Sequence, residues 1–131
     1  MCCVAIRCLI VDDSPRFARV AVELLEEEGI DVLGVASGGE EAVRLARELR
    51  PDLALVDIDL GEDNGLAVAR RLRGEEHGGL ADAVILISTH AQAEFAELIE
   101  ASPAVGFLAK AELSAEAIEG LLVRPNREPA G

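Results

Sequence analysis

Short apolar runs alternate with amphipathic stretches along the whole sequence, and this alternation constrains the fold more than any other feature. The runs are rich in Val, Leu, Ile and Ala, as expected of strands that are buried on both faces. Strands that alternate with helices predict an α/β domain with a doubly wound parallel sheet, covered by helices on both faces. We expect five strands, at Val4–Val11, Asp31–Ala36, Leu53–Val56, Ala83–Ile87 and Ala104–Leu108.

The stretches between these runs carry the spacing and end signals of helices. Pro15 suits the first turn of the first helix, and Ser37 with Glu40 has the spacing of a capping box before the second. A loop is expected over residues 59–64. The first helix should turn inward the residues that recur at i, i+3 and i+4, namely Phe17, Val20, Ala21, Leu24 and Leu25. Later helices are expected from Gly65, over Ala91–Ala101, and from Ser114 to Val123.

Length and composition bound the function. The 131 residues suit one domain, which we expect over residues 1–123 with a frayed tail at 124–131. No run of 18 apolar residues exists, and the apolar start lacks the basic region of a signal peptide, so no membrane association is expected. A net charge of −13 argues against direct nucleic-acid binding. Cys2, Cys3 and Cys8 are interpreted as reduced thiols, which favours the cytoplasm.

Polar residues follow the ends of the expected strands. Open parallel sheets bind ligands outside the carboxyl ends of their strands, where the strand order reverses. In the flavodoxin-like order 2-1-3-4-5 that point lies between the first and third strands. The residues expected at this rim are Asp12, Asp13, Asp57, Ser88, Thr89 and Lys110.

Three neighbouring carboxylates repel one another unless a cation lies among them. Carboxylate oxygens suit Mg²⁺, which also accepts phosphate oxygens, whereas zinc prefers His and Cys ligands that this cluster lacks. Lys110 is the one lysine in a chain with eleven arginines, and it follows the last strand of the same rim. Its ammonium on a flexible stem can meet a phosphoryl oxygen as a point charge. The rim is therefore interpreted as a magnesium and phosphoryl site.

Each of these residues also has a simpler interpretation. Asp12 or Asp13 could cap the first helix, since Asp is a favoured N-cap, and Asp57 could be a turn residue. Ser88 or Thr89 could cap a helix, and Lys110 could be solvated, as most lysines are. The functional interpretation depends on their occurrence together at the right strand ends.

The motifs LIVDDSP, LALVDIDL, DNGL, ILIST and GFLAK, with their separations, resemble the receiver domain of bacterial two-component response regulators. The resemblance covers residues 4 to 123. It implies that Asp57 takes a phosphoryl group from a sensor histidine kinase or a histidine phosphotransfer protein. It further implies that Mg²⁺ is held by Asp12, Asp13, Asp57 and the backbone carbonyl of Asp59.

The resemblance also implies a switch. Lys110 would contact the phosphoryl group, Ser88 would supply the switch hydroxyl, and Phe107 would be the switch aromatic residue. Thr89 stands where the family commonly has Ala or Gly, so it is expected to crowd the phosphoryl site. Asp59 and His90 lie two residues beyond Asp57 and Ser88, at positions that tend to set phosphoryl lifetime in this family.

Several functions compete at this point. The first is a receiver that signals to a protein partner through the surface of its fourth helix, fifth strand and fifth helix, with no enzymatic activity beyond its own phosphorylation and dephosphorylation. The second is the front half of a DNA-binding regulator, although the chain ends soon after its last expected helix. The third is a haloacid-dehalogenase-type phosphatase, suggested by Asp57-Ile58-Asp59. The fourth is a degenerate receiver that only binds partners. The oligomeric state is not predicted.

Overall fold

A computed structural model describes residues 6–60, 63–73, 83–89 and 104–123 of the chain. Within them, strands and helices alternate as the sequence predicts. The strands are β1 (Arg7–Val11), β2 (Asp31–Ala36), β3 (Leu53–Asp57), β4 (Asp59–Leu60), β5 (Asp63–Asn64), β6 (Ala83–Ser88) and β7 (Gly106–Ala109). The helices are α1 (Pro15–Glu27), α2 (Gly39–Leu49), α3 (Gly65–Arg73) and α5 (Ala115–Val123), with a 3₁₀ turn at Lys110–Glu112.

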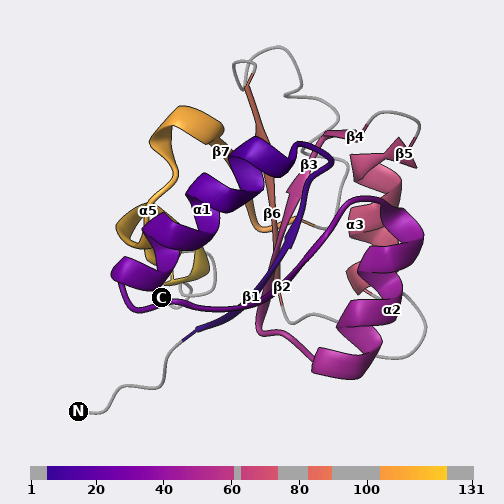
Figure 1. Cartoon of the computed structure of the whole chain (residues 1–131), viewed down its shortest axis with the longest axis horizontal. Coiled ribbons are helices and arrows are strands. Elements are labelled where there is room, and N and C mark those ends of the chain that lie inside the picture. Colours follow the sequence, from indigo (N-terminus) through magenta and orange to yellow (C-terminus); the bar gives the residue numbers. More distant parts are fainter. Residues whose placement is uncertain (1–5, 61–62, 74–82, 90–103, 124–131) are drawn as a thin grey trace, which may run out of the picture.

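Five parallel strands form the central sheet in the order β2-β1-β3-β6-β7. This confirms the flavodoxin-like order 2-1-3-4-5, with the expected fourth and fifth strands as β6 and β7. Helices α1 and α5 lie on one face of the sheet, and α2 and α3 lie on the other (Figure 1). Both faces of the three central strands are therefore covered, which explains why their sequences are apolar without interruption.

The two-residue period of a strand divides the core into two layers. Cys8 and Ile10 of β1 face the cluster that includes Ala21 and Leu25 of α1. The alternate residues of β1, β3 and β6 face the opposite cluster, built on α2 and α3; they are Leu9, Val11, Ala54, Val56, Val84 and Leu86. Burial raises the pKa of the Cys8 thiol to about 12, so this cysteine is a core residue and not a reactive thiol.

Two local expectations about the helices need correction. Val20 was expected to face inward, but it is 56% exposed, because α1 directs Ala18, Ala21 and Leu25 into the core instead. Ser37 does not form a capping box with Glu40. The N-cap of α2 is Gly38, and the amide and hydroxyl of Ser37 both donate to Glu41, 2.9 and 3.1 Å from its Oε1.

The region after β3 also differs from the expected loop. Asp59 pairs with Asn64 and Leu60 with Asp63 in a two-stranded antiparallel ladder, β4–β5, ahead of α3. The helix expected over residues 91–101 and the tail at 124–131 lie outside the described residues. Among the helices that are described, none has the length and apolar character needed to cross a membrane.

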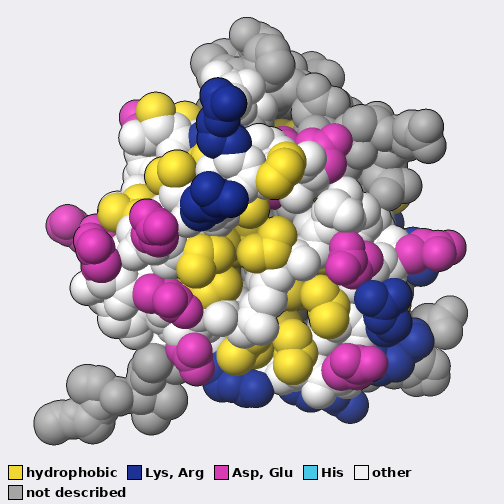
Figure 2. All heavy atoms as spheres, in the orientation of Figure 1, with side chains coloured by type: hydrophobic (Ala, Val, Ile, Leu, Met, Phe, Trp, Pro, Cys, Tyr) yellow, Lys and Arg dark blue, Asp and Glu magenta, His cyan; other side chains and the backbone are white. Residues whose placement is uncertain are grey.

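Strand β2 forms one edge of the sheet, as expected, and it is less buried than the strands beside it. Hydrophobic side chains are visible on the surface between α1 and α2, with acidic and basic side chains around them (Figure 2). Val35 of β2 is 37% exposed. The buried core and the rim described next lie away from this edge, at the centre of the sheet.

Candidate functional site

The carboxyl ends of β1, β3 and β6 bring three buried polar residues to one rim. Asp12 follows β1 directly, Asp57 ends β3, and Ser88 ends β6; their exposed fractions are 2%, 5% and 1%. Parallel pairing aligns Val11 with Val56, so the two aspartates follow neighbouring strands at the same level. Asp57 pairs with Ile87, which puts Ser88 one residue further along the next strand. The strand register therefore builds the rim.

Asp12 is held by the start of α1 and does not cap the helix itself. Its Oδ1 accepts a hydrogen bond from the Ser14 amide at 2.8 Å. Ser14 is the N-cap residue of α1, and its hydroxyl accepts from the Phe17 amide at 3.3 Å. Because Ser14 is the N-cap, capping of α1 does not explain the presence of Asp12 and Asp13 at this rim.

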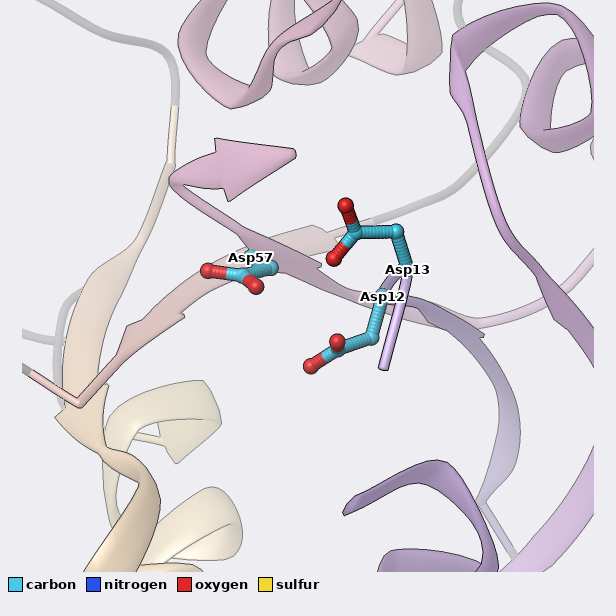
Figure 3. Close-up of side chains that lie close together, drawn as sticks. All are labelled: Asp12, Asp13 and Asp57. Atoms are coloured by element: carbon cyan, nitrogen blue, oxygen red, sulfur yellow. The ribbon is translucent and has the colours of Figure 1, made fainter. Parts of the chain in front are cut away.

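Three carboxylates converge at this point. One carboxylate oxygen from each of Asp12, Asp13 and Asp57 lies within 4.8 Å of the others. Their side chains point toward a shared space beyond the strand ends (Figure 3). Asp13 is exposed whereas Asp12 and Asp57 are buried, so the cluster opens to solvent on the Asp13 side.

Lys110 supplies the positive charge of the site. Its Nζ lies 2.7 Å from Asp12 Oδ2 and 3.2 Å from Asp57 Oδ2, and its side chain is 11% exposed. Burial opposes the charged ammonium, but the two carboxylates outweigh it and raise the pKa of Lys110 above its ordinary value. The ring centroid of Phe17 lies 4.4 Å from the same nitrogen.

The cluster has the chemistry of a site for a hard divalent cation. All three donors are carboxylates, as Mg²⁺ and Ca²⁺ prefer. Asp12 Oδ2 is buried, and the ammonium of Lys110 lies 2.7 Å from it. Lys110 offsets only part of the negative charge of the three carboxylates, so a further cation can be bound there. Asp12, Asp13 and Asp57 could therefore bind a metal ion.

The other predicted residues are placed to different extents. Thr89, directly after Ser88, is exposed, and Phe107 of β7 is half-buried against the cluster on the α2 and α3 face. The backbone of Asp59 belongs to β4, but its side chain lies outside the described parts of the chain. His90 lies outside them entirely. The structure therefore brings Asp12, Asp13, Asp57 and Lys110 together, and leaves the roles of the others as predictions.

Two residues of the site were missed in the sequence. Phe17 was assigned only to the core, although a residue in the first turn of α1 necessarily lies near the rim where β1 ends. Gly65 was assigned only as a helix start. Its amide donates to Ile58 O at 3.1 Å, and a Cβ at Gly65 would lie 2.6 Å from the Ile58 Cα and overlap the carbonyl of Asp57. Gly65 thus lets α3 pack directly behind the peptide of Asp57.

Comparison with known proteins agrees with this geometry. The family model of the response regulator receiver domain matches residues 8–121. A Pseudomonas aeruginosa protein that bears the name of a transcriptional regulator is 39% identical over 105 residues, which are 79% of this chain and 49% of that protein. The DNA-binding response regulator MtrA of Mycolicibacterium smegmatis is 44% identical over 69 residues, 53% of this chain and 30% of MtrA.

Solved structures give the same result. A LuxR-family two-component response regulator from Aurantimonas superposes with a TM-score of 0.78 at 28% identity, over 91% of this chain and 86% of that one. The present chain spans about half the length, or less, of the curated relatives described above.

We predict that Gly65→Ala destabilises the fold and Gly120→Ala does not. The added methyl at position 65 collides with backbone, whereas at Gly120 in α5 it meets no atom within 4 Å. Overpacking should cost about 1–3 kcal/mol at Gly65, and removal of a helical glycine should add about 0.5–1 kcal/mol at Gly120. Urea unfolding of both variants measures the difference. Equal stability of the two would contradict the close packing behind Asp57.

Proposed function

Because this chain belongs to the response regulator receiver family, we propose that it accepts a phosphoryl group on Asp57 and signals to another protein. The observation that supports this most directly is the arrangement around Asp57. Its carboxylate is buried at a strand end, 3.2 Å from the ammonium of Lys110 and within 4.8 Å of two further carboxylates. Such a site combines a nucleophile with the charges that phosphoryl transfer requires.

The proposed reaction is an exchange of phosphorus bonds. A carboxylate oxygen of Asp57 forms a bond to phosphorus as the bond from phosphorus to the donor's imidazole nitrogen breaks. The electron pair stays on that nitrogen, and the histidine leaves as a neutral imidazole because its other ring nitrogen carries a proton throughout. Lys110 faces the negative charge that spreads over the transferred group, and its proximity to Asp57 supports this role.

We propose that Asp12, Asp13, Asp57 and the backbone carbonyl of Asp59 hold Mg²⁺. When bound, the ion offsets the repulsion between the carboxylates and the incoming phosphoryl oxygens. The exclusively carboxylate donors, which lie within 4.8 Å of one another, support this assignment. Without the metal ion, the net negative charge of Asp12, Asp13, Asp57 and Lys110 would repel an anionic phosphodonor.

The proposed output uses Ser88 as the switch hydroxyl and Phe107 as the switch aromatic residue, while Thr89 belongs to the surroundings of the phosphoryl group. A phosphoryl group adds charge and acceptor oxygens, which can draw a nearby hydroxyl and reorder the segment that follows it. Ser88 is buried at the same rim, and Phe107 is half-buried one strand away, so a change at Ser88 could alter the burial of Phe107. The proposed partners are a sensor histidine kinase or a histidine phosphotransfer protein, and a downstream protein target, in the cytoplasm.

A second candidate is the receiver part of a DNA-binding regulator. The name and length of MtrA favour it, because the matched region is 30% of that DNA-binding protein. The mass of the native protein isolated from its source separates the candidates: a mass near 13.8 kDa supports the first, and a much larger one the second. The phosphatase alternative has no such support, since the matched family is the receiver family.

We predict that a small phosphodonor such as acetyl phosphate adds one phosphoryl group to the chain in the presence of Mg²⁺, as measured by intact mass. Asp57→Asn should abolish the addition because an amide is a poor nucleophile. Asp31→Asn is the matched control, since Asp31 is an exposed aspartate at the amino end of β2, whereas the site lies at the carboxyl ends of the strands. This variant should react as the unsubstituted chain does. Equal phosphorylation of the Asp57 variant would contradict the proposal.

We also predict that Mg²⁺ stabilises the folded chain without any phosphodonor. A ligand that binds only the folded state at ten times its dissociation constant adds about 1.4 kcal/mol to the free energy of unfolding. Urea unfolding with and without Mg²⁺ measures this gain, which Asp12→Asn should largely remove and Asp31→Asn should retain. A gain of the same size in all three proteins would show that the ion binds elsewhere.

Phosphoryl lifetime gives a further prediction. Asp59 and His90 lie two residues beyond Asp57 and Ser88 in the sequence. An anion or an imidazole at these positions can order or repel the water that hydrolyses the phosphorylated aspartate. We expect Asp59→Asn and His90→Ala to change the decay rate of the phosphorylated chain, as followed by the loss of the mass increment. Unchanged decay in both variants would refute this assignment.

A further inference from the structure

The ammonium of Lys110 is bounded by three different groups. Two are the carboxylates of Asp12 and Asp57, at 2.7 and 3.2 Å. The third is the ring of Phe17, whose centroid lies 4.4 Å from Nζ. This distance is within the range in which an aromatic face attracts a cation, and the lysine side chain is only 11% exposed. The Phe17 ring is therefore a third partner of the Lys110 ammonium, beside the two carboxylates.

The position of Phe17 is itself fixed. Its amide donates to the hydroxyl of Ser14, and the adjacent Ser14 amide donates to Asp12 Oδ1. Its side chain packs against the core cluster on the α1 and α5 face. One short segment thus ties the ring of Phe17 and the carboxylate of Asp12 to the same helix start, and both contact the same ammonium.

We propose that Phe17 is a positioning residue that holds the ammonium of Lys110 in place for phosphoryl transfer. This inference rests on the proposed function and extends it to a residue that does not touch the reacting atoms. Phe17 acts through Lys110, by attraction to its charge and by exclusion of water from one side of it.

An aromatic ring suits this position better than a third charged partner. The four-carbon stem of lysine is flexible, so with two carboxylates alone the ammonium could move toward either of them. Another carboxylate would restrict the ammonium but would also add a negative charge against an incoming phosphoryl group. The face of a ring attracts the ammonium through its quadrupole while the ring stays neutral. The full positive charge then remains available to the phosphoryl oxygens.

The contact can be measured without any phosphorylation. Lys110 is the chain's one lysine, so its ε-methylene group gives a single distinct NMR signal, which Lys110→Arg removes. Ring current from Phe17 should shift these protons upfield of their position in an unfolded chain. Phe17→Leu should abolish the shift, and Phe17→Tyr, which keeps the ring, should retain it. An ε-methylene signal that is the same in the Leu variant and the unsubstituted chain would overturn the contact.

The functional effect is measured as the rate of phosphorylation by acetyl phosphate with saturating Mg²⁺. Loss of a partly desolvated cation–π contact should slow Phe17→Leu by about threefold to thirtyfold, and Phe17→Tyr should restore the rate. Leu24→Ala is the matched control, because Leu24 packs against the same cluster and lies on α1 about two turns beyond Phe17. It should lose stability yet keep the rate.

A double-mutant cycle tests that Phe17 acts through the lysine. In a Lys110→Met background, Phe17→Leu should change the rate by less than about twofold, because the charge it attracts is gone. The same slowing in both backgrounds, or none in either, would overturn the positioning role. Failure of the unsubstituted chain to become phosphorylated would overturn the proposed function together with this role. A phosphorylated chain that is insensitive to Phe17→Leu would overturn this inference alone.

Discussion

The ion pairs of Lys110 with Asp12 and Asp57 are the interaction on which the site depends. Buried carboxylates at the ends of neighbouring strands repel each other, and with Asp13 they would give three negative charges within 4.8 Å. The ammonium at 2.7 and 3.2 Å offsets part of that repulsion and makes the arrangement compatible with a folded chain. It leaves the cluster with an excess of negative charge, which is the condition under which a divalent cation binds. The same ion pairs therefore stabilise the folded chain and leave the negative charge that a divalent cation requires.

The rest of the fold holds these groups at fixed positions. Parallel pairing of β1, β3 and β6, buried on both faces, sets the levels at which their last residues leave the sheet. The Ser14 cap orients Asp12, and Gly65 allows α3 to pack against the peptide of Asp57. The aliphatic core thus has a functional consequence, because a slip of one residue in β1 or β3 would turn a rim carboxylate toward a helix layer.

Much of the fold, and most residues of the site, could be predicted from the sequence. The alternation of apolar strands and helices is a periodic signal, and it predicted a parallel sheet covered on both faces and the residues at the strand ends. The strand order was not encoded in this signal and was taken from the flavodoxin-like fold. Interactions that depend on tertiary packing could not be predicted in this way. Val20 has the spacing of a core residue but is exposed, because the rotation of α1 against the sheet is set by contacts with other segments. The β4–β5 ladder and the contact of Phe17 with Lys110 likewise join residues whose pairing no local pattern encodes.

We propose that the carboxylate of Asp57, and no other, carries the phosphoryl group. An acyl phosphate is reduced by borohydride to an alcohol, which converts a phosphorylated aspartate into homoserine and leaves free carboxylates unchanged. The chain would be incubated with Mg²⁺ and acetyl phosphate, reduced, digested and mapped by mass spectrometry. We expect homoserine at position 57 and intact aspartate at positions 12 and 13. Homoserine at position 12 or 13, or at none of the three, would refute the assignment of the phosphoryl group to Asp57.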